Sequence, residues 1–348
     1  MRVLHVLNTG GYSGAENVVI SLIKSMPDDV EAAYASPNGV IKEILSEEGI
    51  MFFPIQTPNV NVMTLRKIIR NYKPDIIHAH DFLASVIAAV GGRKIPIISH
   101  LHNNPFWIKK ICIWTVIYVC SSIKYKRILA VSDAVIDEFV FGKYLKGKSE
   151  IVGNPVDLQT IRDKADQNIR SDKYDVIFLG RLTEAKNPEF FLEIVKDLVK
   201  KIPSVHVVIV GDGELRDVIK RKCKEFNLEG NVKLYGFLRN PYNMLQSSKL
   251  LCMPSRWEGF GLAAVEALTF GLPVVASPVG GLVNIVTKEC GKLCVGKEEY
   301  VDEICKLLVD EQYYQEKSAK ARERAEEFDN IDQYSKNIVE IYKEILNK

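Results

Sequence analysis

Residues 249–277 read KLLCMPSRWEGFGLAAVEALTFGLPVVAS. The segment begins with a short apolar run that predicts a strand, and it passes through a glycine-containing loop into the helical stretch LAAVEALTFG, which Gly271 closes. It ends in a second apolar run, PVVAS. Two buried strands joined by a helix form the unit from which parallel sheets are built, with helices on both faces. The segment therefore predicts an α/β fold.

The same alternation runs along the whole chain in two series. The first series of strand candidates is RVLHVLN, EAAYAS, MFFPI, DIIHAH, PIISHLH and RILAVS, and the second is VIFLG, HVVIVG, VKLYGF, KLLCMPS and PVVAS. A length of 348 residues also favours two domains. We therefore expect two doubly wound, Rossmann-like domains facing a cleft, at 1–165 and 166–330, with a linker near 156–173. The amphipathic helix within 331–348 is expected to pack back on the first domain.

Composition excludes several classes of protein. Hydrophobic residues make up 47% of the chain and charged residues 26%, which is typical of a globular protein. A net charge of +2 gives no reason to expect a nucleic-acid partner. The seven cysteines are odd in number and form no CxxC pair, so reduced thiols and a cytoplasmic location are expected. Cys290 and Cys294 lack neighbouring ligands, and no metal site is predicted.

Positive charge gathers in one region of the first half. Between Arg93 and Lys148 there are ten Lys or Arg residues and three acidic ones, around the uncharged run Ile111–Ile123 of 13 residues. This run is too short to span a bilayer, which takes about 20 residues. Two interpretations stay open for residues 106–127. One is a buried helix, and the other is an in-plane contact with an anionic membrane, with aromatic side chains at headgroup level, namely Phe106, Trp107, Trp114 and Tyr118.

Two carboxylates flank a bare turn in the opening segment. Glu258 lies in the loop, and Glu266 lies about one turn into the helix. Between them, Gly259, Phe260 and Gly261 offer backbone N–H groups at a helix start, where a phosphate binds well. Carboxylates suit hydroxyl groups rather than phosphate. A phosphate bracketed by two polyols is a nucleotide sugar, with ribose on one side and a hexose on the other.

A second glycine loop follows the first strand, in NTGGYSGAEN. Gly10, Gly11 and Gly14 allow a tight turn and leave N–H groups free at the start of a helix. The spacing differs from that of a dinucleotide fingerprint, and no acidic residue follows the second strand. The loop is therefore either a ligand contact or a purely structural turn.

Two further groups of residues follow strands in the second half. Arg181 and Lys186, in FLGRLTEAKNP, could hold a diphosphate, the first as a planar fork and the second as a point charge. The alternative is an incidental basic pair in a solvated loop. Gly236 and Phe237, in LYGFL, could meet a flat nucleobase.

Taken together, these residues resemble the retaining GT-B glycosyltransferases of family 4 over nearly the whole chain. The E-x7-E motif from Glu258 to Glu266 and the R-x4-K pair Arg181 and Lys186 carry the resemblance, with DIIHAHD, HLHN and GNPVD in the expected order. The resemblance implies that Glu258 contacts the donor sugar, Glu266 the ribose, and the two cations the diphosphate. His102 would lie near the reacting centre.

The resemblance also implies that the Gly10–Gly11 loop approaches the donor from the other domain. The chain departs from the family pattern at Asn284, where a glutamate is often found, and at Pro155, where glycine is usual. No DxD motif occurs, so metal-independent transfer without a cofactor is expected.

The expected activity is transfer of a hexose or N-acetylhexosamine from a nucleotide sugar, UDP in preference to GDP. The acceptor would be a saccharide, lipid-linked, in cell-surface polysaccharide synthesis at the inner face of the plasma membrane. The alternatives are a GT-B nucleotide-sugar epimerase and a non-catalytic nucleotide-sugar-binding protein.

Overall fold

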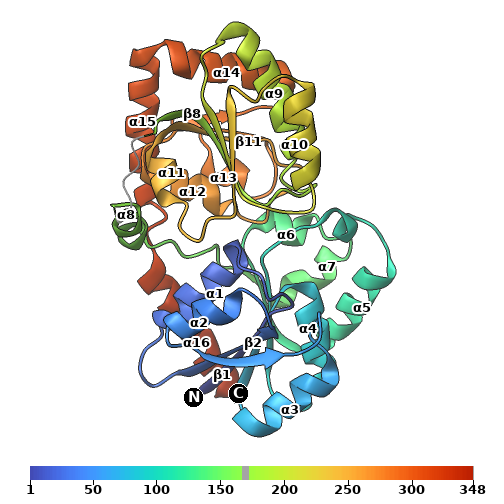
Figure 1. Ribbon diagram of the computed structural model, residues 1–348. Helices are drawn as coiled ribbons and strands as arrows, with labels where there is room; N and C mark the ends of the chain where they lie inside the picture. The colour runs from blue at the N-terminus through green and yellow to red at the C-terminus, as the bar shows by residue number, and fades with distance from the viewer. Residues whose placement is uncertain (167–171, 348) are drawn as a thin grey trace. The chain divides into compact units, whose positions relative to one another are not determined.

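The computed structural model describes residues 1–166 and 172–347. The chain divides into two compact units (Figure 1). Unit 1 comprises Met1–Pro155 together with Asn330–Lys348, and unit 2 comprises Val156–Asp329. Each unit is a parallel sheet with helices on both faces, so the predicted pair of doubly wound α/β domains is confirmed.

Unit 1 is built on a seven-stranded sheet in the order β3-β2-β1-β4-β5-β6-β7. The strands are β1 (Arg2–Val6), β2 (Glu31–Pro37), β3 (Met51–Ile55), β4 (Ile76–His80), β5 (Ile97–Leu101), β6 (Tyr125–Ala130) and β7 (Ser149–Ile151). The α-helices are α1 (Gly14–Lys24), α2 (Ile41–Glu47), α3 (Val62–Tyr72), α4 (Asp81–Gly91), α5 (Ile113–Ser121), α6 (Asp133–Asp137), α7 (Gly142–Leu145) and α16 (Ile331–Leu346), and the 3₁₀ helices are η1 (Phe106–Lys109), η2 (Ser122–Lys124) and η3 (Lys146–Lys148). The strand order reverses between β1 and β4, and ligands of such sheets bind where the order reverses.

The C-terminal helix α16 belongs to unit 1. Its apolar stripe includes Ile338 and Tyr342, and it joins a buried cluster with residues of the central strands, among them Val3 and Ile76. The hydroxyl of Ser335 also donates to the backbone carbonyl of Ser25 at 2.8 Å. A segment that follows unit 2 in the sequence therefore completes the core of unit 1.

Unit 2 is built on a six-stranded sheet in the order β10-β9-β8-β11-β12-β13. The strands are β8 (Tyr174–Leu179), β9 (Val207–Val210), β10 (Val232–Gly236), β11 (Ser248–Met253), β12 (Val274–Ala276) and β13 (Gly291–Leu293). The helices are α8 (Leu158–Asp166), α9 (Pro188–Lys201), α10 (Arg216–Glu225), α11 (Tyr242–Gln246), α12 (Leu262–Thr269), α13 (Leu282–Ile285), α14 (Lys297–Val309) and α15 (Glu311–Glu326). Here the order reverses between β8 and β11, which are hydrogen-bonded neighbours.

The structure differs from the sequence prediction around residue 160. The boundary lies between Pro155 and Val156 rather than at 165, because helix α8 packs within unit 2, against α11 and α12. The predicted linker at 156–173 therefore contains a helix, and its part at 167–171 lies outside the described residues. Two three-residue strands, β7 and β13, were not predicted.

The packing of α16 gives a first prediction. Ile338 is fully buried in the cluster that α16 shares with the sheet of unit 1. Replacing it with alanine leaves a cavity, and we expect the free energy of unfolding to fall by about 2–5 kcal/mol. The neighbouring Lys336 is exposed, so Lys336→Ala should change this free energy by less than about 0.5 kcal/mol. Urea unfolding of both variants tests the difference, and equal stabilities would contradict the packing.

Candidate functional site

A partly buried ion pair marks the edge of the sheet in unit 2. Glu258 lies in the loop after β11 and is only 6% exposed. Its Oε1 atom pairs with the ammonium group of Lys186 and accepts a hydrogen bond from the hydroxyl of Ser255 at 2.8 Å. Lys186 lies in the loop after β8, and β8 and β11 are neighbouring strands, so the sheet itself brings the two residues together.

Two glycines after β12 hold the loop that carries Glu258. A Cβ atom at Gly280 would lie 1.7 Å from the carbonyl oxygen of Glu258, and one at Gly281 would lie 2.3 Å from that of Phe260. Gly280 also has a φ of 53°, in the left-handed region that favours glycine. The N–H group of Gly281 donates to the carbonyl of Gly259 at 3.2 Å. The backbone from 258 to 260 is thus fixed by direct contact with the next loop.

Helix α12 begins beside the ion pair with free donors. Gly261 is its N-cap, at a φ of 106°, which a residue with a side chain would rarely adopt. In the described part of the chain, the N–H groups of Phe260, Gly261 and Leu262 meet no backbone or side-chain acceptor. Such N–H groups at the start of a helix can bind an anion.

Glu266 lies on α12 and is half-buried. Burial raises the pKa of its carboxyl group to about 7, against the opposing effects of the Tyr242 hydroxyl and the charges of Lys164 and Lys186. The Tyr242 hydroxyl donates to the carboxylate over a long 3.4 Å. Near neutral pH the group is therefore present both as carboxylate and as carboxylic acid, and a hydroxyl ligand could bond to either form.

The remaining predicted residues of unit 2 lie at the same sheet edge, because the carboxyl ends of parallel strands share one edge. Arg181 follows β8 and is exposed, and it has no ion pair or side-chain hydrogen bond among the described residues. Gly236 ends β10 with a φ of 76°, and its carbonyl accepts a bond from the N–H of Gly211 at 2.8 Å. Phe237, the next residue, is 44% exposed. The structure thus joins Lys186 to Glu258, whereas Arg181 bonds to neither glutamate.

In unit 1, the predicted glycine loop forms one wall of a pocket of about 570 Å³. The pocket is lined by residues 8–11, 37–38 and 55–59, none of which is charged. Gly10 packs tightly there, because a Cβ atom on it would lie 2.5 Å from the carbonyl oxygen of Asn38. Gly14 begins helix α1. The side chains of Asn8 and Asn59 bond to each other at 3.2 Å, so the polar wall is already ordered.

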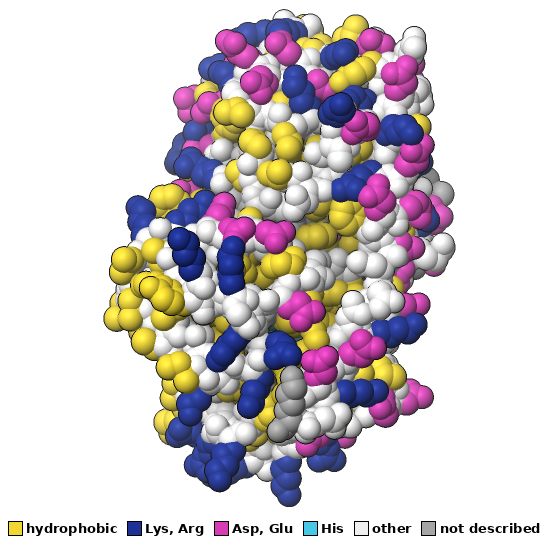
Figure 2. Space-filling model, turned by 180° about the vertical axis from the view of Figure 1, so that it is seen from behind, with side chains coloured by type: hydrophobic (Ala, Val, Ile, Leu, Met, Phe, Trp, Pro, Cys, Tyr) yellow, Lys and Arg dark blue, Asp and Glu magenta, His cyan; other side chains and the backbone are white. Residues whose placement is uncertain are grey.

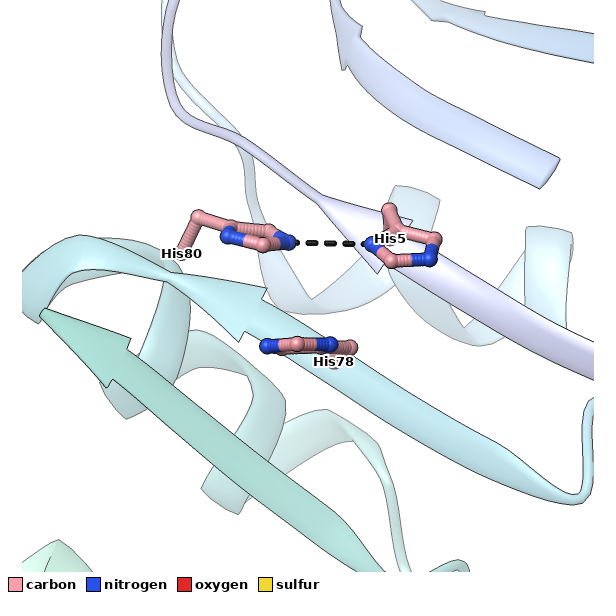
Figure 3. A group of neighbouring side chains, drawn as sticks. All are labelled: His5, His78 and His80. Carbon is pink, nitrogen blue, oxygen red and sulfur yellow. Dashed lines mark hydrogen bonds between the residues drawn. The ribbon is translucent and has the colours of Figure 1, made fainter. Parts of the chain in front are cut away.

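Five of the six histidines are buried on one face of the sheet in unit 1: His5 on β1, His78 and His80 on β4, and His100 and His102 on and just after β5. They form two hydrogen-bonded rows. His80 bonds to His5 at 3.0 Å, as Figure 3 shows, and to His102 at 2.9 Å. His78 bonds to His100 at 3.1 Å and to the hydroxyl of Tyr342 on α16 at 2.6 Å.

Burial lowers the pKa of all five imidazoles. It brings the pKa of His5 to about 3 and that of His102 to about 4, so both rings are neutral at pH 7. The pKa values of His78, His80 and His100 are lowered well below 6.5, by burial first and then by the neighbouring rings. His102, the predicted residue near the reacting centre, can therefore offer a hydrogen bond but no positive charge.

These rings come close enough to raise the question of a metal ion. The ligand atoms of two groups of three, His5, His78 and His80, and His80, His100 and His102, lie within 4.8 Å of one another. An imidazole nitrogen binds a metal along its lone pair, which lies in the ring plane. His78 and His80 are stacked at 4.4 Å and 19°, and their lone pairs run side by side rather than converging (Figure 3). The geometry suits a hydrogen-bonded stack, and metal-independence stays a prediction.

Sequence reasoning missed several residues around these sites. It singled out His102 alone, although the alternating histidines of IIHAH and SHLH place all their rings on one face of two strands. It also missed Asp81, held at a φ of 65° after β4, whose carboxylate accepts a bond from the N–H of His102 at 2.9 Å. Ser255 gave no signal of its own. Gly280 and Gly281 begin the segment GGLVNIV, which matches the start of a family pattern, but they were given no role because that role depends on a contact between loops.

Comparison with known proteins agrees with this architecture. Residues 159–328 match the family model of glycosyl transferases group 1, and residues 12–160 match that of glycosyltransferase family 4. The crystal structure of Anabaena HepE in complex with UDP and glucose superimposes with a TM-score of 0.85, at 21% identity over 99% of both chains. Together these define the class, the GT-B glycosyltransferases.

The chain belongs to the family 4 type of this class. It is 31% identical to an uncharacterized glycosyltransferase of Methanocaldococcus jannaschii over 61% of this chain and 57% of the relative's length. It is 25% identical to the UDP-Gal:alpha-D-GlcNAc-diphosphoundecaprenol alpha-1,3-galactosyltransferase of Escherichia coli, over 83% of this chain and 82% of the relative.

The buried histidines give a prediction about acid stability. Their folded-state pKa values lie below the value of about 6.5 in an unfolded chain, so the unfolded state takes up protons that the folded state does not. The contribution of the buried histidines to stability is therefore complete above about pH 6.5 and falls as the pH drops toward 4, by up to about 1.4 kcal/mol per pH unit for each histidine.

Urea unfolding between pH 7.5 and 4.5 measures this slope. His5→Gln should flatten it, whatever the variant's stability at pH 7.5. His206, the sixth histidine, is exposed, so His206→Gln should leave the slope unchanged. Parallel curves for His5→Gln and the unmodified protein would contradict the assignment of the slope to the buried rings.

Proposed function

We propose that this glycosyltransferase transfers a hexose or N-acetylhexosamine from a UDP-sugar to a saccharide acceptor with retention of configuration and without a metal ion. The acceptor would be lipid-linked, and the product would serve cell-surface polysaccharide synthesis at the inner face of the plasma membrane. The observation that carries the proposal is the Lys186–Glu258 pair beside the free N–H groups that start α12.

The chemistry of this edge fits a nucleotide sugar. Lys186, Arg181 and the start of α12 supply positive charge and N–H donors for a diphosphate. Glu258 and Glu266 flank them and supply acceptors for hydroxyl groups. Lys186 and Ser255 both contact Oε1 of Glu258, and Oε2 has no hydrogen-bond partner in the described part of the chain, so it could accept a bond from the sugar.

These residues would also stabilise the leaving group. As the bond between the anomeric carbon and the phosphate oxygen breaks, negative charge develops on UDP, and Lys186, Arg181 and the α12 amides would stabilise it. The acceptor oxygen would form its bond to the anomeric carbon on the same face, and its proton would pass to the departing phosphate. A neutral His102 would orient a hydroxyl group and would not act as a cation.

Support for the acceptor comes from unit 1. The pocket at residues 8–11, 37–38 and 55–59 presents amide and hydroxyl groups without charge, which suits an uncharged saccharide. The Gly10–Gly11 part of its wall would still face the donor, as the family resemblance implies. Two similar proteins support the UDP donor and the lipid-linked acceptor. The E. coli relative uses UDP-Gal and an undecaprenol-linked acceptor, and the Anabaena structure contains UDP and glucose.

A panel of UDP-, GDP- and ADP-sugars tests the donor. A ligand at 100 times its dissociation constant stabilises the folded state by about 2.7 kcal/mol. For a unit of this size that corresponds to a rise of roughly 5–10 °C in melting temperature. We expect the rise with UDP-sugars, and release of UDP when a saccharide acceptor is added. A rise with GDP-sugars alone would contradict the donor assignment, and binding without transfer would indicate a non-catalytic binding protein.

Replacing Glu258 tests the site itself. Glu258→Gln keeps the shape of the side chain but removes its charge, so Lys186 loses its counter-ion and the donor sugar loses a strong acceptor. We expect kcat/KM to fall by about 10²-fold or more, as UDP release would measure. Glu289→Gln changes an exposed glutamate of the same unit and should leave turnover unchanged. Equal rates for the two variants would rule out the proposed role.

A further inference from the structure

Helix α5 in unit 1 carries no charged residue, yet most of it is uncovered. Of its nine residues, IWTVIYVCS, only Thr115 and Tyr118 are buried. A helix that is apolar on all sides is normally enclosed by the protein. The interpretation of this segment as a buried helix is therefore wrong, because among the described residues only one narrow side of α5 is packed against the unit.

The exposed apolar side chains continue beyond α5 into its neighbours. The most exposed are Tyr144 at 81%, Ile123 at 78%, Ile111 at 72% and Ile113 at 65%. We call the whole set the α5 surface, and it consists of Phe106, Ile111, Ile113, Trp114, Val116, Ile123, Val140 and Tyr144. Figure 2 shows apolar side chains gathered at the left edge of the molecule, where α5 lies, with lysine or arginine side chains nearby. Apolar gatherings of this kind mark interaction sites.

The charges around the α5 surface are nearly all positive. Two of its three acidic neighbours are already paired, Glu138 with Lys109 at 3.1 Å and Asp137 with Lys146 at 2.8 Å. Three further lysines are exposed and have no ion pair in residues 1–166 and 172–347: Lys124, Lys126 and Lys143. Lys110 stands over the ring of Phe106 at 4.5 Å. The surface thus offers an apolar centre and a cationic border.

This combination selects one kind of partner. No helix among the described residues has the length and apolar character needed to cross a bilayer. An apolar strip with aromatic residues and a border of lysines suits binding in the plane of the membrane–water interface instead. There the apolar side chains enter the boundary between the headgroups and the acyl chains, and the lysines contact anionic headgroups. A protein partner of the same shape would need an acidic rim, whereas a bilayer rich in anionic lipid supplies negative charge on every side.

We propose that the α5 surface docks in the plane of an anionic lipid bilayer, with Ile111, Ile113 and Trp114 in the headgroup–acyl boundary and Lys124, Lys126 and Lys143 on the lipid phosphates. The proposal deepens the lipid-linked acceptor of the proposed function by naming the surface that meets the membrane. It is tested by lipid binding and does not need turnover.

Co-sedimentation of the full chain with vesicles tests the docking. Vesicles of phosphatidylcholine with about 30% phosphatidylglycerol carry a negative surface charge. They should bind the protein at least about tenfold more tightly than pure phosphatidylcholine, with binding weakened by salt. Ile113→Ser with Trp114→Ser should weaken this binding about tenfold or more. Lys124→Glu with Lys126→Glu should abolish the preference for phosphatidylglycerol.

Matched controls distinguish docking through the α5 surface from non-specific binding to vesicles. Val295 and Val309 are 79% and 75% exposed in unit 2, so Val295→Ser with Val309→Ser removes similar apolar exposure elsewhere. Lys42 and Lys67 are exposed in unit 1, away from the α5 surface, and Lys42→Glu with Lys67→Glu matches the charge change. Both controls should bind vesicles as the unmodified protein does. Equal losses in the controls and the α5 variants would overturn the proposal.

Two further outcomes would also overturn it. One is that the unmodified protein does not bind anionic vesicles. The other is self-association through the α5 surface, seen as concentration-dependent elution that Trp114→Ser removes, without lipid binding. The melting-temperature rise with UDP-sugars should persist in every variant, because none of the changed residues belongs to the donor site. Vesicle binding without that rise would refute the proposed function alone, and the rise without vesicle binding would refute the docking alone.

Discussion

The ion pair between Lys186 and Glu258 is the constraint on which the site of unit 2 depends. A buried carboxylate costs several kcal/mol unless a cation and hydrogen bonds compensate it, and here Lys186 and Ser255 provide both. The pair can form only if the loops after β8 and β11 lie side by side, which requires these strands to be neighbours in the sheet. The contact of Gly280 with the carbonyl of Glu258 then sets the backbone position. The position of β8 beside β11 in the sheet therefore determines the geometry of the site.

Unit 1 accommodates its buried polar side chains in a different way. Its five histidines remain uncharged and are hydrogen-bonded to one another in two rows, and one row continues to Tyr342 on α16. A shift of one residue in the register of β4 would turn His78 and His80 to the opposite face and break both rows. The stack therefore specifies the register of the central strands and ties the C-terminal helix to the sheet. It also places a neutral His102 where β5 ends.

The strands that the sequence revealed have continuous runs of apolar residues, such as the Val and Ile runs that became β8 and β9. The two that it did not reveal, β7 with SEI and β13 with GKL, are short edge strands with little apolar character, and their pairing depends on neighbours. Helix α8 was predicted to be part of a linker. Only three of its residues are buried, and the helices that cover them lie far along the chain, so the local sequence gives little indication of this packing. In the site, motif spacing indicated Glu258 and Lys186. The glycines of GGLVNIV were part of a family pattern, but the contact of Gly280 with the loop of Glu258 joins segments far apart in the sequence and could not be predicted from it.

Segment 106–127 shows most clearly what composition cannot predict, because an apolar helix has the same composition whether or not another element covers it. The structure supplies what composition lacks: within α5 itself, only Thr115 and Tyr118 are buried. The uncharged pocket follows β1, β2 and β3, and Phe106 and Ile111 follow β5, so both begin at the carboxyl edge of one parallel sheet. A saccharide attached to a lipid could reach that edge while its lipid stays in the bilayer. The α5 surface and the uncharged pocket, in the roles that we propose for them, would then serve the same substrate.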